Sequence, residues 1–182
     1  MSAYIPTNII SITDGQLFLE SKLFFAGQRP AVNVGLSVSR VGGDAQTKAM
    51  KKASGAIRLD LAQYREMEVF TQFSSDLDEV TRNQLTYGQG LMALLRQPQY
   101  APYSQHRQVI LLTAALHHLF QEIPLSEIPA FRDRLLKTLE DQNGPLCDRI
   151  DRTGQLSEED QNTVLSQAKA CLSFWRNAVC PA

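Results

Sequence analysis

The chain has 182 residues, enough for one domain or for a domain with part of another. Its net charge of −1 and its 43% hydrophobic content fit a protein with a real core, and they argue against a nucleic acid or an anionic membrane as partner. No run of about 18 uninterrupted apolar residues occurs, so the chain is not expected to span a membrane by itself. The first residues lack the basic and apolar regions of a secretory signal.

The first part of the chain predicts short strands. Residues 8–12 are rich in isoleucine, and the turn dipeptide Asp14-Gly15 precedes an apolar run at residues 17–19. Residues 32–38 alternate between valine or leucine and small or polar residues, which is the period of a strand with one apolar face. Three such strands are too few to complete an α/β domain that has helices on both faces.

The rest of the chain, after Gly42-Gly43, predicts helices. Asp44 stands where a helix N-cap belongs, and apolar residues recur every three to four positions over residues 45–73. Further helices are predicted at residues 76–95, 104–121 and 129–141, as a short turn after Gly144-Pro145, and after Ser157 as the N-cap of the last helix. We therefore expect a mainly α fold dominated by an antiparallel helical bundle.

Cysteine and histidine give no sign of a metal site. The odd number of cysteines and the lack of a C-x-x-C pair predict free thiols at Cys147, Cys171 and Cys180. The histidines do not stand at metal-ligand spacing from them: His106, His117 and His118. We expect ordinary packing and solvent exposure for these side chains.

Two glycine patterns imitate phosphate-binding loops. Residues 42–48 have the spacing of a P-loop, but Thr47 replaces its second glycine and Ala49 replaces its magnesium-binding hydroxyl. Residues 88–90 imitate part of a dinucleotide fingerprint, yet they lie in a predicted helix and follow no strand. The sequence therefore predicts no phosphate cradle of its own.

Longer motifs carry more information. They are SAYIPTNIISITDGQLFLES from residue 2, RPAVNVGLSVSRVGGDAQTKAMKKASGAIRLDLAQYRE from residue 29, QFSSDLDEVT from residue 72 and QPQYAP from residue 97. These segments resemble the alpha subunit of F-type ATP synthases nearly residue for residue. The resemblance is close over residues 2–102 and looser from Tyr103 onward, where helical pattern and length carry it.

The resemblance implies two parts with different origins. Residues 1–43 would be the last few β-strands of an incomplete P-loop-type α/β nucleotide-binding domain, and residues 44–182 would be the carboxy-terminal helical domain. The family's amino-terminal barrel and most of its nucleotide-binding domain lie upstream of the matching region. A truncated or split alpha subunit is therefore expected.

The resemblance also implies a catalytic contribution. In this family alpha and beta subunits alternate in a hexameric ring around a rotating stalk, and alpha offers an arginine finger in trans. That arginine is the one in SVSRVG, hence Arg40, and a guanidinium suits charge that builds on a transferring phosphoryl group. Ser11, Gly15 and Val38 would line the same interface. A surface arginine and ordinary strand and turn positions are the alternatives.

A second, non-catalytic nucleotide site is implied as well. Arg29 and Pro30, with Gln97 and Gln99 of the Q-x-Q-Y-A-P motif, match positions that surround an adenine in the family. An amide side chain can both donate to and accept from a base edge. A plain polar loop before Pro102 is the alternative. ATP or ADP with Mg²⁺ is expected in the assembled complex only, and neither cofactor nor autonomous catalysis is expected of the isolated chain.

The implied partners are beta, gamma and delta subunits, with no nucleic acid and with membrane contact only through the complex. The implied location is the cytoplasmic face of a bacterial inner membrane. A stand-alone helical interaction module without nucleotide chemistry is the alternative function. An independent nucleotide-binding enzyme is nearly excluded because no P-loop occurs.

Overall fold

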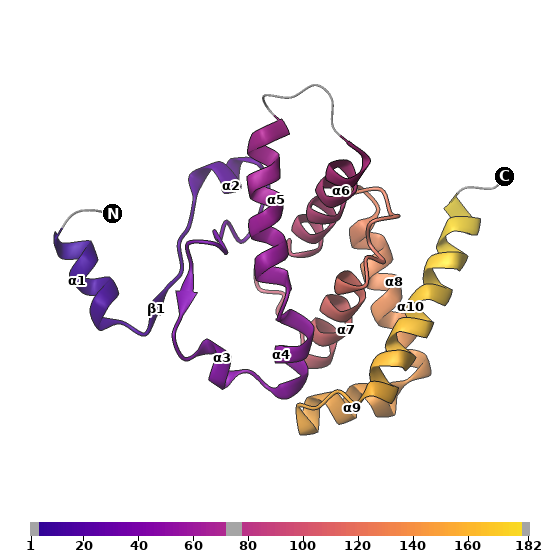
Figure 1. Ribbon diagram of the computed structural model, residues 1–182. Helices are drawn as coiled ribbons and strands as arrows, with labels where there is room; N and C mark the ends of the chain where they lie inside the picture. The colour runs from indigo at the N-terminus through magenta and orange to yellow at the C-terminus, as the bar shows by residue number, and fades with distance from the viewer. Residues whose placement is uncertain (1–3, 72–77, 180–182) are drawn as a thin grey trace.

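The computed structural model describes residues 4–71 and 78–179, and most of them are helical (Figure 1). The helices are α1 (Tyr4–Ile12), α2 (Ser21–Phe25), α3 (Gly42–Ala45), α4 (Lys48–Ser54), α5 (Ile57–Thr71), α6 (Glu79–Leu94), α7 (Gln105–Leu116), α8 (Ile128–Gln142), α9 (Gly144–Thr153) and α10 (Glu158–Val179). The strands β1 (Gly15–Gln16) and β2 (Val38–Ser39) pair antiparallel. The predicted fold class, mainly α with a few strands at the amino-terminal end, is confirmed.

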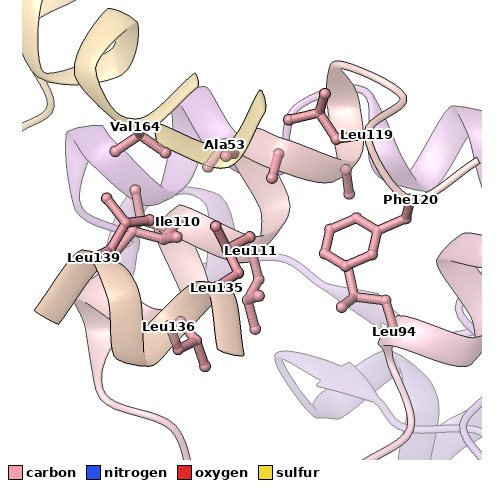
Figure 2. Close-up of a cluster of buried hydrophobic side chains, with 14 of the residues drawn as sticks. Ala53, Leu94, Ile110, Leu111, Leu119, Phe120, Leu135, Leu136, Leu139 and Val164 are labelled. Atoms are coloured by element: carbon pink, nitrogen blue, oxygen red, sulfur yellow. The ribbon is translucent and has the colours of Figure 1, made fainter. Parts of the chain in front are cut away.

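Helix α7 lies at the centre of the helical part, in contact with α4, α8, α9 and α10. Figure 2 shows how the core is built around it: Ile110 and Leu111 of α7 face Leu135 and Leu139 of α8. Leu135 and Leu139 are four residues apart, which places their side chains on one face of α8, and the adjacent Ile110 and Leu111 are both buried as well. Each fully buried leucine or isoleucine contributes about 1.5–3 kcal/mol of transfer free energy, so this seam holds the bundle together.

Side-chain caps fix where several helices begin. The Ser157 hydroxyl accepts from the Asp160 amide at 3.0 Å, which confirms the predicted cap of the last helix. The predicted cap at Asp44 is wrong, because Asp44 lies inside the short helix α3. Thr47 is the cap instead, and its hydroxyl accepts from the Met50 amide at the start of α4. The helix expected over residues 45–73 is therefore divided into pieces.

Several other boundaries differ from the expectation. The helix expected over residues 104–121 ends at Leu116, and His118 takes a positive φ of 60°, so the two adjacent histidines follow the helix. The turn expected after Gly144 is a full helix, α9. The expected start near residue 76 and Cys180 lie outside the described residues. Cys147 and Cys171 are buried free thiols.

The strand expected over residues 8–12 is wrong: these residues belong to α1, which has no buried residue and projects from the bundle in Figure 1. A strand needs a neighbour to satisfy its backbone groups, whereas a helix satisfies them within its own segment. Among the residues the structure describes, no strand lies beside this segment. The local helix follows from that missing neighbour.

The long strand expected over residues 32–38 is also wrong. Only Val32 makes an isolated bridge, to Leu19 in the run expected as a strand over residues 17–19, while β2 covers just the far end. Between them the chain turns at Asn33, whose backbone oxygen accepts from the Ser37 amide at 3.0 Å. Alternating apolar and polar residues can therefore also form a turn whose apolar side packs against the bundle.

Helices α5 and α6 pack closely at Gly88. A Cβ atom added there would lie 2.2 Å from Cδ2 of Tyr64. We expect Gly88→Ala to lower the free energy of unfolding by about 1–3 kcal/mol, because overpacking outweighs the better helix propensity of alanine. Urea unfolding measures this change in the free energy of unfolding. Gly43→Ala is the control, because a Cβ added at Gly43 meets nothing within 4 Å. Equal, small effects of both substitutions would contradict the close approach of α5 and α6 at Gly88.

Candidate functional site

The β1–β2 pair brings the four residues expected at a catalytic interface into one place. Gly15 pairs with Ser39, one residue before Arg40, and Val38 pairs with Gln16. The Arg40 amide donates to the Asp14 carbonyl at 2.7 Å, and its guanidinium reaches the Ser11 carbonyl at 3.5 Å. A short antiparallel ladder therefore holds the end of α1 against the arginine.

Arg40 itself is exposed, and no described carboxylate neutralises its charge. Within residues 4–71 and 78–179, no carboxylate forms a salt bridge with it, and its one side-chain partner is a neutral carbonyl. A guanidinium in this state retains hydrogen-bond donors for an incoming group. The arrangement can place a fixed positive charge against an anion that belongs to another molecule.

Gly15 and Ser11 also have structural roles within the chain. A Cβ at Gly15 would lie 2.1 Å from the Val38 carbonyl oxygen, so the close approach of β1 and β2 requires a glycine. The Ser11 hydroxyl donates to the Thr7 carbonyl at 2.8 Å within α1. The ordinary strand and turn positions weighed as alternatives describe part of what Gly15 does in β1, whereas Ser11 lies in α1 and not in a strand. The interface role of both residues stays a prediction.

The residues expected around an adenine meet in a separate cleft. Its volume is 910 Å³, and Arg29, Pro30, Gln97 and Gln99 all line it. The Gln97 amide donates to the Arg29 carbonyl at 2.8 Å, which joins the amino-terminal segment to the loop after α6. The cleft therefore lies between two segments about seventy residues apart in the chain, and this hydrogen bond joins them.

The two glutamines of the cleft differ in what their side chains do. The Gln97 amide group donates to the Ala101 carbonyl at 2.8 Å and so shapes the loop. Gln99 is exposed, and its side chain makes no hydrogen bond with any described residue. Gln99 therefore has an amide group available to a ligand in the cleft, while the Gln97 side chain supports the wall of the cleft.

Sequence reasoning missed two aromatic residues of this cleft, Phe24 and Tyr100. The Arg29 guanidinium lies 4.7 Å from the centre of the Phe24 ring, and Tyr100 is 92% exposed with a φ of 61°. Flat apolar faces beside an amide suit a planar heterocycle. Tyr100 directly follows Gln99 in the sequence, whereas Phe24 stands five residues before Arg29, so no local pattern pointed to Phe24.

A charged cluster joins α7 to α8 and α9. Arg107 pairs with Glu140 through two contacts of 2.6 and 3.1 Å, and His106 bridges Glu140 and Asp151 at 3.1 and 2.7 Å. The Arg107 guanidinium, with a smaller contribution from His106, holds the pKa of Glu140 below its usual range despite partial burial. The cluster fixes the start of the central helix.

We expect Glu140→Gln to lower the free energy of unfolding by about 1 kcal/mol at neutral pH, a modest effect because the Arg107 side chain is 41% exposed. Since the folded-state pKa of Glu140 is lowered, its contribution is complete above the unfolded pKa of about 4.3 and is lost as the pH falls below that value. Urea unfolding from pH 7 to pH 3 measures this beside the exposed Glu66→Gln. A pH-independent difference would contradict it.

Comparison with known proteins assigns the two parts to one family. The nucleotide-binding domain of the ATP synthase alpha/beta family matches residues 1–39, and the ATP synthase alpha/beta chain, C terminal domain, matches residues 46–171. The chain is thus a helical domain that follows the end of a nucleotide-binding domain. It belongs to the ATP synthase alpha/beta family.

The relatives named ATP synthase subunit alpha match almost the whole chain. The one from Pectobacterium carotovorum subsp. carotovorum (strain PC1) is 55% identical over 177 residues, 96% of this chain and 34% of the relative. The one from Petrotoga mobilis (strain DSM 10674 / SJ95) is 53% identical over 176 residues, 97% of this chain and 35% of the relative. The chain spans about a third of the length of these relatives. The expected resemblance to alpha subunits is confirmed, beyond Tyr103 as well.

Among the described residues, no helix is long and apolar enough to cross a membrane. Within the same residues, no group of three or more histidine, cysteine or acidic side chains is placed to hold a metal ion.

Proposed function

We propose that the chain is the carboxy-terminal segment of a regulatory, non-catalytic alpha subunit of F-type ATP synthase, and that it supplies Arg40 in trans to a beta-subunit catalytic site. ATP synthesis coupled to proton transport is the activity of the assembled complex. The observation that carries the proposal is the exposed, unneutralised guanidinium of Arg40 at the end of the β1–β2 pair. The similarity to subunits named alpha supports it.

The chemistry of Arg40 follows from the charge of the transition state. Negative charge spreads over the equatorial oxygens of the phosphoryl group during transfer, and a guanidinium can meet it with two N–H donors and a fixed charge. Ser11, Gly15 and Val38 form the surface around the arginine and would contact the same interface. The backbone contacts of Arg40 pre-position it, so little ordering is needed when the phosphoryl group arrives.

The cleft of Arg29, Pro30, Gln97 and Gln99 is proposed as the adenine side of a non-catalytic nucleotide site. The phosphates and Mg²⁺ of bound ATP or ADP would lie against an upstream P-loop in the assembled complex. The cleft supplies amides and apolar walls for a base. Because the sequence contains no P-loop, we propose no cofactor for the isolated chain.

We expect Gln99→Ala, in a complete alpha subunit that carries this segment, to weaken ADP binding at the non-catalytic site by roughly twofold to tenfold. That range corresponds to the loss of one hydrogen bond worth about 0.5–1.5 kcal/mol. Turnover should change little. Nucleotide titration compares it with Gln63→Ala, an exposed amide on α5 outside the cleft. Equal ADP affinities for both variants would contradict the assignment of Gln99 to the adenine side of the site.

The partners we propose are beta, gamma and delta subunits, with the complex at the cytoplasmic face of a bacterial inner membrane. The proposed domain boundary stays between residues 43 and 44. Large exposed apolar side chains in the first part are consistent with a covered surface in a larger assembly: Ile5 at 70%, Ile12 at 84%, Leu17 at 79% and Phe25 at 85% exposure.

Copurification tests the proposal against the alternative of a stand-alone interaction module. A complete alpha subunit whose last third is this chain is expressed with beta and gamma subunits, and a tag on alpha is used for capture. We expect beta in equal amount with alpha, because the two alternate in the ring. Capture of a well-folded alpha subunit without beta would favour the module.

A further inference from the structure

A cavity of 350 Å³ opens where α4 meets the turn between α9 and α10, away from both sites described above. Its polar lining comes from three helices and the turn between two of them, and it includes Lys48, Lys52, Arg149, Gln155, Ser157 and Asp160. Three of these side chains are positively charged and one is negatively charged. The cavity is therefore a concave site with an excess of positive charge.

Backbone contacts hold the two sides of this cavity together. Lys48 and Lys52 are four residues apart on α4, so they lie on one face of the helix. The Ala49 amide donates to the Gly154 carbonyl at 2.9 Å, which docks the turn against the start of α4. Gly154 has a φ of 64°, and a Cβ there would lie 2.8 Å from Cγ2 of Thr47. The spacing between the lysines and the opposite wall is thus set by the fold.

The one acidic residue of the cavity is already engaged. Oδ1 of Asp160 pairs with Arg149, and its Oδ2 accepts from the Ser157 amide at 3.4 Å. Burial would raise the pKa of Asp160, but hydrogen bonds from Ser157 and Arg149 lower it below its usual range. Asp160 therefore stays ionised and directed at these partners, so it does not neutralise the lysines.

Both lysines are without an acidic partner in the part of the chain that the structure describes. The salt bridge on this helix instead joins Lys51 to Asp44, at 3.8 Å, outside the cavity. Subtracting the one negative charge of Asp160 from the three positive charges leaves a local charge of +2. Because Arg149 is already paired with Asp160, the uncompensated charge belongs to the two lysine ammonium groups, which repel each other unless an anion lies between them.

We propose that this cavity binds the phosphate group of a small molecule. A phosphate dianion matches the local charge, and its oxygens only accept hydrogen bonds. The lining offers the matching donors: two ammonium groups, the remaining N–H groups of Arg149, and the Ser157 hydroxyl, whose oxygen already accepts from the Asp160 amide at 3.0 Å. A carboxylate has one charge and would leave the site only half neutralised.

NMR titration of the full chain with inorganic phosphate at about pH 7.5 tests the proposal, with sodium chloride holding the ionic strength constant. We expect saturable shifts of the Lys48, Lys52 and Arg149 amides, with a dissociation constant on the order of 1 mM. A parallel titration with glycerol 3-phosphate distinguishes free phosphate from a phosphate ester. Binding of either one supports the site.

Matched variants on α4 decide whether the cavity is responsible. The double variant Lys48→Gln/Lys52→Gln is expected to weaken binding about tenfold or more, because it removes both uncompensated charges. Lys51→Gln removes a lysine from the same helix but not from the cavity, and it should bind as the wild type does. Non-saturating shifts, or equal losses in the double variant and Lys51→Gln, would overturn the proposal. The test does not depend on assembly with beta.

Discussion

Replacing Arg40 with alanine, in a complete alpha subunit assembled with beta, is expected to lower ATP turnover by roughly 10³–10⁵-fold. That range corresponds to about 4–7 kcal/mol of transition-state stabilisation. Nucleotide affinity at the catalytic sites should stay largely intact, because the arginine acts on charge that develops only during phosphoryl transfer. Steady-state ATPase rates beside nucleotide titrations measure the two effects separately.

Two further variants sharpen this result. Arg40→Lys should restore only part of the rate, since lysine keeps the charge but loses the planar pair of donors. Arg58→Ala is a matched control: Arg58 is also exposed, and it also donates to a backbone carbonyl, that of Ser37, at 3.3 Å. Near-normal turnover of the Arg40→Ala ring, or an equal loss in Arg58→Ala, would show that the finger assignment is mistaken.

Truncation of Phe131 should have the largest effect on stability. Phe131 is fully buried in α8, and its ring meets those of Phe120 and Trp175 edge to face, each with centroids 5.6 Å apart. We expect Phe131→Ala to lower the free energy of unfolding by about 3–5 kcal/mol, the usual cost of a phenylalanine-sized cavity. Urea unfolding of the full chain, followed by far-UV circular dichroism, measures the change.

The control for this variant is Phe174→Ala, which removes the same side chain from a position on α10 that is 57% exposed. Its cost should stay below about 1 kcal/mol, because little new surface meets water and no closed cavity forms. Similar losses for the two variants would mean that the helical core is not centred where α7, α8 and α10 meet.

The sequence predicts the bundle well where local apolar spacing decides the structure. The helix expected over residues 129–141 differs from α8 by one residue at each end, and Ser157 is the cap that was expected. Prediction failed at residues 8–12 and 32–38, where strand formation depends on neighbours far away in the chain. Isoleucine and valine favour strands only when a partner strand is present to pair with.

The candidate sites were predicted in a different way. The roles of Arg40 and Gln99 were predicted from the resemblance to alpha subunits, because spacing alone predicts only a surface arginine and an amide in a polar loop. The structure adds what local pattern could not give: the contact from Arg40 to Ser11, and the cleft that Phe24 and Tyr100 share with Gln99. The phosphate cavity could not be predicted from the sequence either, because Lys48 and Arg149 are brought together only by packing of α4 on the turn before α10.

ATP turnover of a chimeric ring tests the central claim most directly. The last third of the Pectobacterium alpha subunit is replaced by this chain, which is 55% identical over 177 residues, and the chimera is assembled with that organism's beta and gamma subunits. The unmodified ring is the reference. We expect the chimeric ring to form and to hydrolyse ATP within roughly tenfold of the reference, about 1.4 kcal/mol in activation free energy. A ring that assembles but turns over no faster than its own Arg40→Ala variant would contradict the claim.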